Sequence, residues 1–81
     1  MKYTMAYIDN DDYSGIKILV NLSDDELVAE LMRLTEYEDL YEGMGADSAF
    51  AYIEEAIAEN VYFGLTMTVV DDYSGRVVFE M

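Results

Sequence analysis

The order in which hydrophobic spacing changes along this chain constrains its fold more than any other feature. Apolar side chains recur with a period of two in three segments, at 3–8, 61–70 and 77–81, and a β-branched apolar run that is also typical of a strand stands at 16–20. The central part of the chain instead spaces its apolar residues as an amphipathic helix does. A period of two is typical of strands, and a period of 3.6 is typical of helices. The sequence therefore predicts the element order ββααββ.

The length of the chain limits how these elements combine. Eighty-one residues are enough for one small domain that buries roughly 60% of its chain surface. We expect residues 1–81 to form a single α+β domain, a four-stranded antiparallel sheet with two helices packed on one face. The spacing leaves the strand order open.

The start of the first helix is marked by capping residues. Ser23 and Glu26 have the spacing of a capping box, and Leu22 and Leu27 have that of a hydrophobic staple. The helix then carries one apolar stripe and leaves its charged residues outside. We expect Glu30, Arg33 and Glu36 on that polar side.

A second helix follows a loop at 37–46. We expect Asp47 or Ser48 to cap it and Asn60 to lie just past its end near Glu59. Its inward side chains are predicted to be Phe50, Ile53, Ala56 and Ile57.

The same five residues occur in both predicted hairpin turns. Asp-Asp-Tyr-Ser-Gly stands at 11–15 and again at 71–75, each time before an apolar strand. Two interpretations stay open. The repeat is either turn chemistry, with Asp at the entry and Gly in a left-handed position, or a pair of matching tyrosine-bearing tips in a pseudo-symmetric fold.

The charge of the chain exceeds what solubility requires. Eighteen Asp and Glu oppose four Lys and Arg, a net charge of −14, whereas a magnitude of about 2–8 suffices for a small domain. Like charge at this density destabilises a compact state by self-repulsion. The excess negative charge therefore indicates a function that is separate from folding and solubility.

The residue types present argue against catalysis and against a cofactor or metal. The chain has neither His nor Cys, so it lacks the commonest general base, thiolate chemistry and the commonest metal ligands. The acidic stretch from Asp9 lacks the Gly and Glu of a calcium-binding EF-hand loop, and Gly43-Met44-Gly45 lacks the Lys of a phosphate loop. We expect no enzyme activity, no cofactor and no metal site.

The acidic residues of the helices and the loop are the candidate partner-binding residues. Their density approaches that of the phosphates of a nucleic acid, and Tyr37 and Tyr41 stand among them as aromatic anchors. Such a surface fits a partner rich in Arg and Lys. The first candidate set is Asp24, Asp25, Glu30, Glu36, Glu38, Asp39 and Glu42, and the second is Glu54, Glu55 and Glu59.

In length, charge and aromatic content, and in its lack of His and Cys, the chain resembles the small acidic DNA-mimic inhibitors of phages and mobile elements. These include anti-CRISPR and antirestriction proteins. The resemblance implies a non-enzymatic inhibitor that occupies the nucleic-acid groove of a basic host defence protein, either a CRISPR effector complex or a restriction nuclease. It also implies action in the cytoplasm of a bacterial or archaeal cell.

Other interpretations of the acidic composition remain open. One alternative is a small interaction or assembly module, either a monomer or a homodimer that pairs exposed strands, and another is an acidic protein from a halophile. A regulator that sequesters a transcription factor would present the same surface. In every case the negative charge disfavours direct binding to nucleic acid or to anionic lipid, and the apolar runs are too short for a membrane span.

Overall fold

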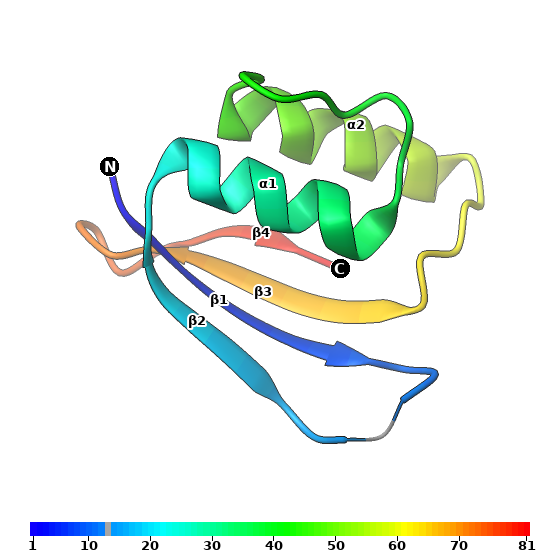
Figure 1. Cartoon of the computed structure of the whole chain (residues 1–81), viewed down its shortest axis with the longest axis horizontal. Coiled ribbons are helices and arrows are strands. Elements are labelled where there is room, and N and C mark those ends of the chain that lie inside the picture. The colour runs from blue at the N-terminus through cyan, green and yellow to red at the C-terminus, as the bar shows by residue number, and fades with distance from the viewer. Residues whose placement is uncertain (13) are drawn as a thin grey trace. The chain divides into compact units, whose positions relative to one another are not determined.

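A computed structural model of the chain describes residues 1–12 and 14–81. It confirms the predicted α+β class, with two hairpins of an antiparallel sheet flanking two helices along the chain (Figure 1). The elements are β1 (Tyr3–Asp9), β2 (Lys17–Leu22), α1 (Asp24–Thr35), α2 (Ala46–Ala58), β3 (Leu65–Asp71) and β4 (Val77–Glu80).

These elements form two compact units of almost equal length. The sheet unit comprises residues 1–23 and 64–81 and contains all four strands. The helical unit comprises residues 24–63 and contains α1, α2 and the loop between them. Each unit is described separately below.

The strand order of the sheet unit is β2-β1-β3-β4, which the sequence left open. Every neighbouring pair is antiparallel, and β1 pairs with β3 along its whole length, from Tyr3 opposite Asp71 to Asp9 opposite Leu65. The two hairpins therefore meet at their first strands. As a result, β2 and β4 are the edges of the sheet.

Alternate residues of the two central strands are buried, as the period of two predicted. Because side chains in a strand point to opposite faces in turn, these buried residues share one face of the sheet. The buried apolar side chains of the sheet unit are Tyr3, Met5, Tyr7, Leu22, Met67, Val69 and Phe79.

Two predictions about the second hairpin were wrong. The predicted strand 61–70 begins only at Leu65, after Gly64 takes up a positive φ of 70°. In the β3–β4 pair an irregularity between Val69 and Val70 places Val77 opposite Val70 and Phe79 opposite Val69. Val77 and Phe79 therefore lie on opposite faces, although their spacing of two predicted the same face.

In the helical unit, α1 begins at Asp24, directly after the predicted cap residue Ser23. Leu27, Val28 and Leu31 from its predicted apolar stripe are buried. The two helices lie side by side (Figure 1). The helical spacing of apolar residues therefore predicted correctly that this side of α1 is buried.

The predicted cap of α2 was wrong. The helix begins at Ala46, and its N-cap is Gly45, which has no side chain that could cap the helix. Starting there brings Ala46 into the buried stripe that continues with Ala49, Phe50 and Ile53. Burial of this stripe therefore sets the start of the helix, and Asp47 lies in the first turn, where the helix dipole favours a carboxylate.

The end of α2 follows the prediction. Glu59 is the C-cap, and Asn60 beyond it has a positive φ of 69°. The amide of Val61 donates to the carbonyl of Ala56 (3.0 Å) and the amide of Asn60 donates to that of Ile57 (2.9 Å), the two bonds of a Schellman motif. Ile57 itself is 39% exposed, so its predicted inward position was wrong.

Candidate functional site

The charge of the protein is concentrated in the helical unit. Twelve of the eighteen acidic residues but only one of the four basic residues, Arg33, lie between residues 24 and 63, a net charge of −11. The sheet unit has six acidic and three basic residues, a net charge of −3. The two units are of nearly equal length, so the difference is one of charge density.

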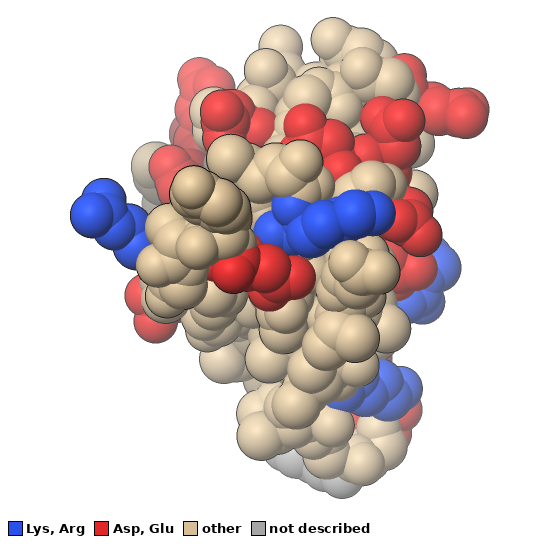
Figure 2. All heavy atoms as spheres, turned by 90° about the vertical axis from the view of Figure 1, so that its left-hand side faces the viewer, with Lys and Arg blue, Asp and Glu red and all other residues tan. Residues whose placement is uncertain are grey.

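The carboxylates of the helical unit are available to a partner. Eleven of the twelve acidic residues are exposed, and the twelfth, Glu30, is half-buried. In the view of Figure 2 most of the red carboxylate groups lie in the upper half, with tan and blue groups among them, and the lower half is mostly uncharged. These carboxylates are therefore accessible from solvent on the surface of the helical unit.

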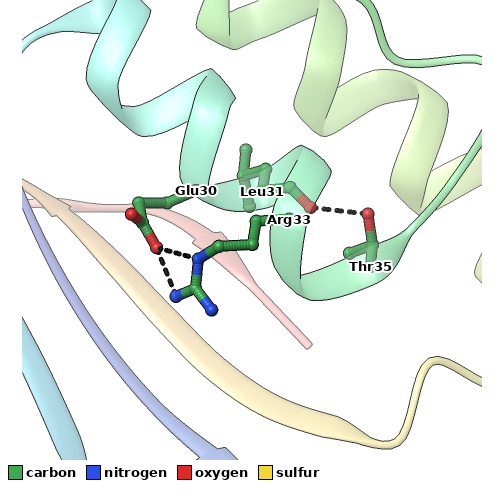
Figure 3. Close-up of polar contacts among 4 residues, drawn as sticks. All are labelled: Glu30, Leu31, Arg33 and Thr35. Atoms are coloured by element: carbon green, nitrogen blue, oxygen red, sulfur yellow. Dashed lines mark hydrogen bonds and ion pairs between the residues drawn. The ribbon is translucent and has the colours of Figure 1, made fainter.

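The end of α1 fixes the direction in which the acidic loop leaves the helix. The hydroxyl of Thr35 donates to the carbonyl of Leu31 at 2.6 Å (Figure 3) and accepts a hydrogen bond from the amide of Tyr37 at 3.4 Å. Glu36 lies between them with a positive φ of 52°, and its amide donates to the carbonyl of Met32. This is an αL helix end at a residue that is not glycine.

Carboxylates from both predicted acidic sets influence the pKa of Tyr37. A hydrogen bond to the carboxylate of Asp39 raises the pKa of the Tyr37 hydroxyl, with smaller contributions from burial and from the negative charges of Asp39, Glu59 and Glu55. Its ring meets Phe63 edge-on, with the ring centroids 5.6 Å apart. The pKa of Tyr37 therefore responds to the charge of Asp39 from the first set and to those of Glu55 and Glu59 from the second.

A shallow groove of about 400 Å³ lies between α1 and the loop that follows it. Ala29, Met32 and the buried Val28 line it with apolar atoms, and Gly43 also lines it. Two carboxylates, those of Asp25 and Glu42, also line the groove. This arrangement suits the aliphatic stem and charged end of a Lys or Arg side chain.

No family model, curated protein or solved structure matches this chain. Any account of its function therefore rests on the geometry and charge of its own residues.

The remaining predicted site residues differ in their exposure and in whether a neighbouring side chain neutralises their charge. The Arg33 guanidinium donates to the carboxylate of Glu30 through Nε (3.1 Å) and a terminal nitrogen (2.6 Å), so Glu30 is partly neutralised (Figure 3). Tyr41 is 59% exposed, as expected for an anchor, whereas Tyr37 is half-buried. The other predicted carboxylates are exposed, namely Asp24, Asp25, Glu36, Glu38, Asp39, Glu42, Glu54, Glu55 and Glu59.

The sequence analysis missed three features of this surface. Glu26 and Asp47 are exposed acidic residues of the same unit but were considered only as helix-start residues. Phe63, the ring partner of Tyr37, was assigned to a strand. Counting all carboxylates between the two hairpins would have found Glu26 and Asp47, whereas no local pattern signals the pairing of Tyr37 with Phe63.

The two Asp-Asp-Tyr-Ser-Gly turns occupy different positions. Because β1 and β3 are antiparallel, the turns after them lie at opposite ends of the sheet. Asp71 is the last residue of β3 and accepts hydrogen bonds from the Tyr73 amide and the Ser74 hydroxyl, whereas Asp11 lies beyond the end of β1. The turn interpretation is therefore sufficient for 71–75, and Tyr13 lies outside the described residues.

Residues 1–12 and 14–81 contain neither a cluster of metal ligands nor a helix that could span a membrane. Within these ranges no three or more Asp and Glu side chains are arranged to hold a metal ion. Within the same ranges no helix has the length and apolar character to cross a membrane.

Proposed function

We propose that this protein is a DNA-mimic inhibitor that occupies the nucleic-acid groove of a basic host defence protein, such as a CRISPR effector complex or a restriction nuclease. The observation that carries the proposal is the net charge of −11 on the 40 residues of the helical unit. The proposed activity is stoichiometric competition for the groove in the host cytoplasm, without a chemical step.

The charge density of the helical unit is comparable with that of duplex DNA. The 13 residues of α2 extend over about 20 Å at about 1.5 Å per residue. A duplex of that length carries about twelve phosphate charges at one per roughly 1.7 Å. The helical unit carries twelve carboxylates, so it offers a basic groove a similar number of ion pairs.

The groove beside α1 supports the same proposal at the level of one side chain. A cationic side chain of the partner can lay its methylene groups on Ala29 and Met32 while its charge meets Asp25 and Glu42. Tyr41 adds an exposed aromatic ring next to Glu42, and such rings are enriched at interfaces.

The unequal division of charge also favours mimicry over general acidic adaptation. Adaptation to high salt predicts acidic residues over the entire surface. Two units of nearly equal length instead carry −11 and −3. The strands are short of acidic residues as well, with Asp9, Asp71 and Glu80 the acidic residues in them.

The proposal is tested by capture of the target from bacterial lysate at about 0.1 M salt, followed by elution with duplex DNA or at about 1 M salt, where the screening length falls from roughly 10 Å to 3 Å. A single nuclease or guide-RNA complex that duplex DNA displaces would support mimicry. A transcription factor displaced in the same way would indicate a regulator. A mixture of basic proteins that DNA does not displace would contradict the proposal.

Charge-reversal variants then test the position of the site on the captured target. Glu38→Lys/Asp39→Lys/Glu42→Lys is expected to abolish inhibition with the fold intact, because all three carboxylates are exposed. The matched control is Asp11→Lys/Asp12→Lys/Glu80→Lys, which changes the net charge equally but in the sheet unit. Equal loss of inhibition in the two triple variants would show that total charge, not this surface, is what the target recognises.

A further inference from the structure

The second unusual surface of this protein is apolar and lies on the sheet unit. Three aliphatic side chains at the edge strand β2 are more than 60% exposed, those of Ile16 (66%), Ile18 (62%) and Val20 (67%). At the opposite edge, Val77 on β4 is 53% exposed. Single exposed aliphatic residues are ordinary, but a group on one sheet indicates an interaction surface.

Strand register places Ile18 and Val77 on one face of the sheet, and the alternation of side chains before and after Ile18 assigns Ile16 and Val20 to the same face. Ile18 lies opposite Ala6, and Ala6 lies opposite Thr68, so the three form a row across neighbouring strands. In the next row Thr4 lies opposite Val70, and Val70 opposite Val77. We call the surface formed by these rows, together with Ile8, Ile16 and Val20, the outer face.

The outer face has both a hollow and projecting side chains. The hollow has a volume of about 150 Å³ and lies over the small side chain of Ala6, with Ile8, Ile16, Thr66 and Thr68 among its lining residues. A hollow of that size accommodates an apolar group about as large as benzene. Ile18 projects beside it at the edge of the sheet. The outer face therefore offers both an aliphatic side chain that can insert into a partner surface and a hollow that can receive such a side chain.

The charge of the outer face fits an uncharged partner surface. Its described rows contain mainly aliphatic and Thr side chains. Acidic groups stand at the margin. Glu80 lies opposite Thr68 on the edge strand β4, and the Asp72 carboxylate accepts a hydrogen bond from the Thr4 hydroxyl at 2.6 Å. A basic partner would find few carboxylates there. A second copy of the chain brings an equally uncharged surface, and a contact of this kind between the sheet units joins the halves that carry only −3 each.

We propose that the outer face is a homodimer interface in which Ile18 of each copy fits the hollow over Ala6 of the other. Such an interface is symmetric, because each copy contributes the same projection and the same hollow. The proposal is independent of the proposed inhibitory function.

The size of the outer face sets the expected strength of the dimer. Four strands about 4.8 Å apart and about six residues long, at about 3.3 Å per residue, give a face of roughly 400 Å². Two such faces remove roughly 800 Å² or somewhat more from water, which is less than stable specific interfaces bury and falls among weak, transient contacts. We therefore expect a weak, reversible dimer that forms in the micromolar to millimolar range, and more readily when salt screens the repulsion between the copies.

Sedimentation velocity over roughly 10 µM to 1 mM protein, at about 0.1 M and about 1 M salt, tests the proposal. The wild type is expected to dimerise with concentration and more strongly at the higher salt. Ile18→Lys is expected to weaken the dimer at least tenfold, because it places a charge in the partner's apolar hollow. Tyr62→Lys is the matched control, since it adds the same charge at a 74% exposed residue of the helical unit and leaves the outer face intact.

The possible results separate clearly. A monomer at every concentration in both salts would overturn the proposal, and so would a dimer that Ile18→Lys leaves unchanged. Circular dichroism checks that the variant is folded, and Val20→Lys provides a second substitution at a 67% exposed position. Loss of the dimer in the folded outer-face variants, with retention in Tyr62→Lys, would support the interface.

Discussion

Replacement of Glu36 by glycine is expected to stabilise the protein. Glu36 has a φ of 52°, a left-handed conformation at the end of α1. The Cβ atom makes this conformation unfavourable by roughly 1–2 kcal/mol, and glycine adopts it without that cost. The greater freedom of glycine in the unfolded chain offsets about 0.5–1 kcal/mol of the gain. The net expectation for Glu36→Gly is a stabilisation of about 0.5–1 kcal/mol.

The effect of removing the Glu36 carboxylate on stability must be separated from the effect of relieving the backbone strain. Glu36→Ala removes the same charge from the helical unit but keeps a Cβ atom, so it is the control for the reduced self-repulsion. Urea unfolding followed by circular dichroism measures both variants. With a urea dependence of roughly 1 kcal/mol per M for a small domain, the midpoint of Glu36→Gly should rise by roughly 0.5–1 M.

The comparison between the two variants decides the matter. If Glu36→Gly unfolds at the same urea concentration as Glu36→Ala, or at a lower one, the left-handed backbone is not a source of strain and the reasoning is refuted. Under the proposed function the same glycine variant should also inhibit less well, because it lacks one of the carboxylates offered to the groove.

Two further predictions concern the neighbours of Glu36. Thr35→Val should lower the free energy of unfolding by about 1–3 kcal/mol, because the buried hydroxyl bonds to Leu31 and Tyr37 are lost; urea unfolding measures this, and Thr35→Ser, which keeps the hydroxyl, should recover most of it. The pKa of Tyr37 is raised by its hydrogen bond to Asp39, so the folded state holds that proton more tightly than the unfolded chain does. Its stabilising effect is present below the ordinary tyrosine pKa near 10 and is lost as pH rises through the higher folded value. Urea midpoints from about pH 9 to 11 should therefore fall less steeply in Tyr37→Phe than in Tyr62→Phe, and equal slopes would contradict this account.

The strands and the first helix could be predicted because each follows from a local pattern. Tyr3, Met5 and Tyr7 alternate and are buried, and Asp24 begins α1 directly after Ser23. The start of α2 was missed because a capping rule competed with burial. Beginning the helix at Ala46 buries its side chain, and this outweighs the side-chain cap that Asp47 or Ser48 would have supplied.

The candidate site was predictable in composition but not in arrangement. The exposure of Glu38, Asp39 and Glu42 follows from their place in a polar loop. The effect of the Glu55 and Glu59 charges on the pKa of Tyr37 depends on how the helical unit folds, and no local spacing encodes it. Likewise, β-branched residues favour a strand at Ile18 but do not say which side of that strand remains uncovered.

The helical unit and the sheet unit each contain features that do not favour a stable, isolated fold. Dense negative charge and a left-handed Glu36 both lie in the helical unit, where each lowers stability. Exposed aliphatic side chains lie in the sheet unit, around Ile18. Because real proteins break such rules mainly where function requires it, each departure suggests a separate function. Their separation means that substitutions can remove one while leaving the other, so loss of inhibition without loss of the dimer, and the reverse, are both expected from single-surface variants.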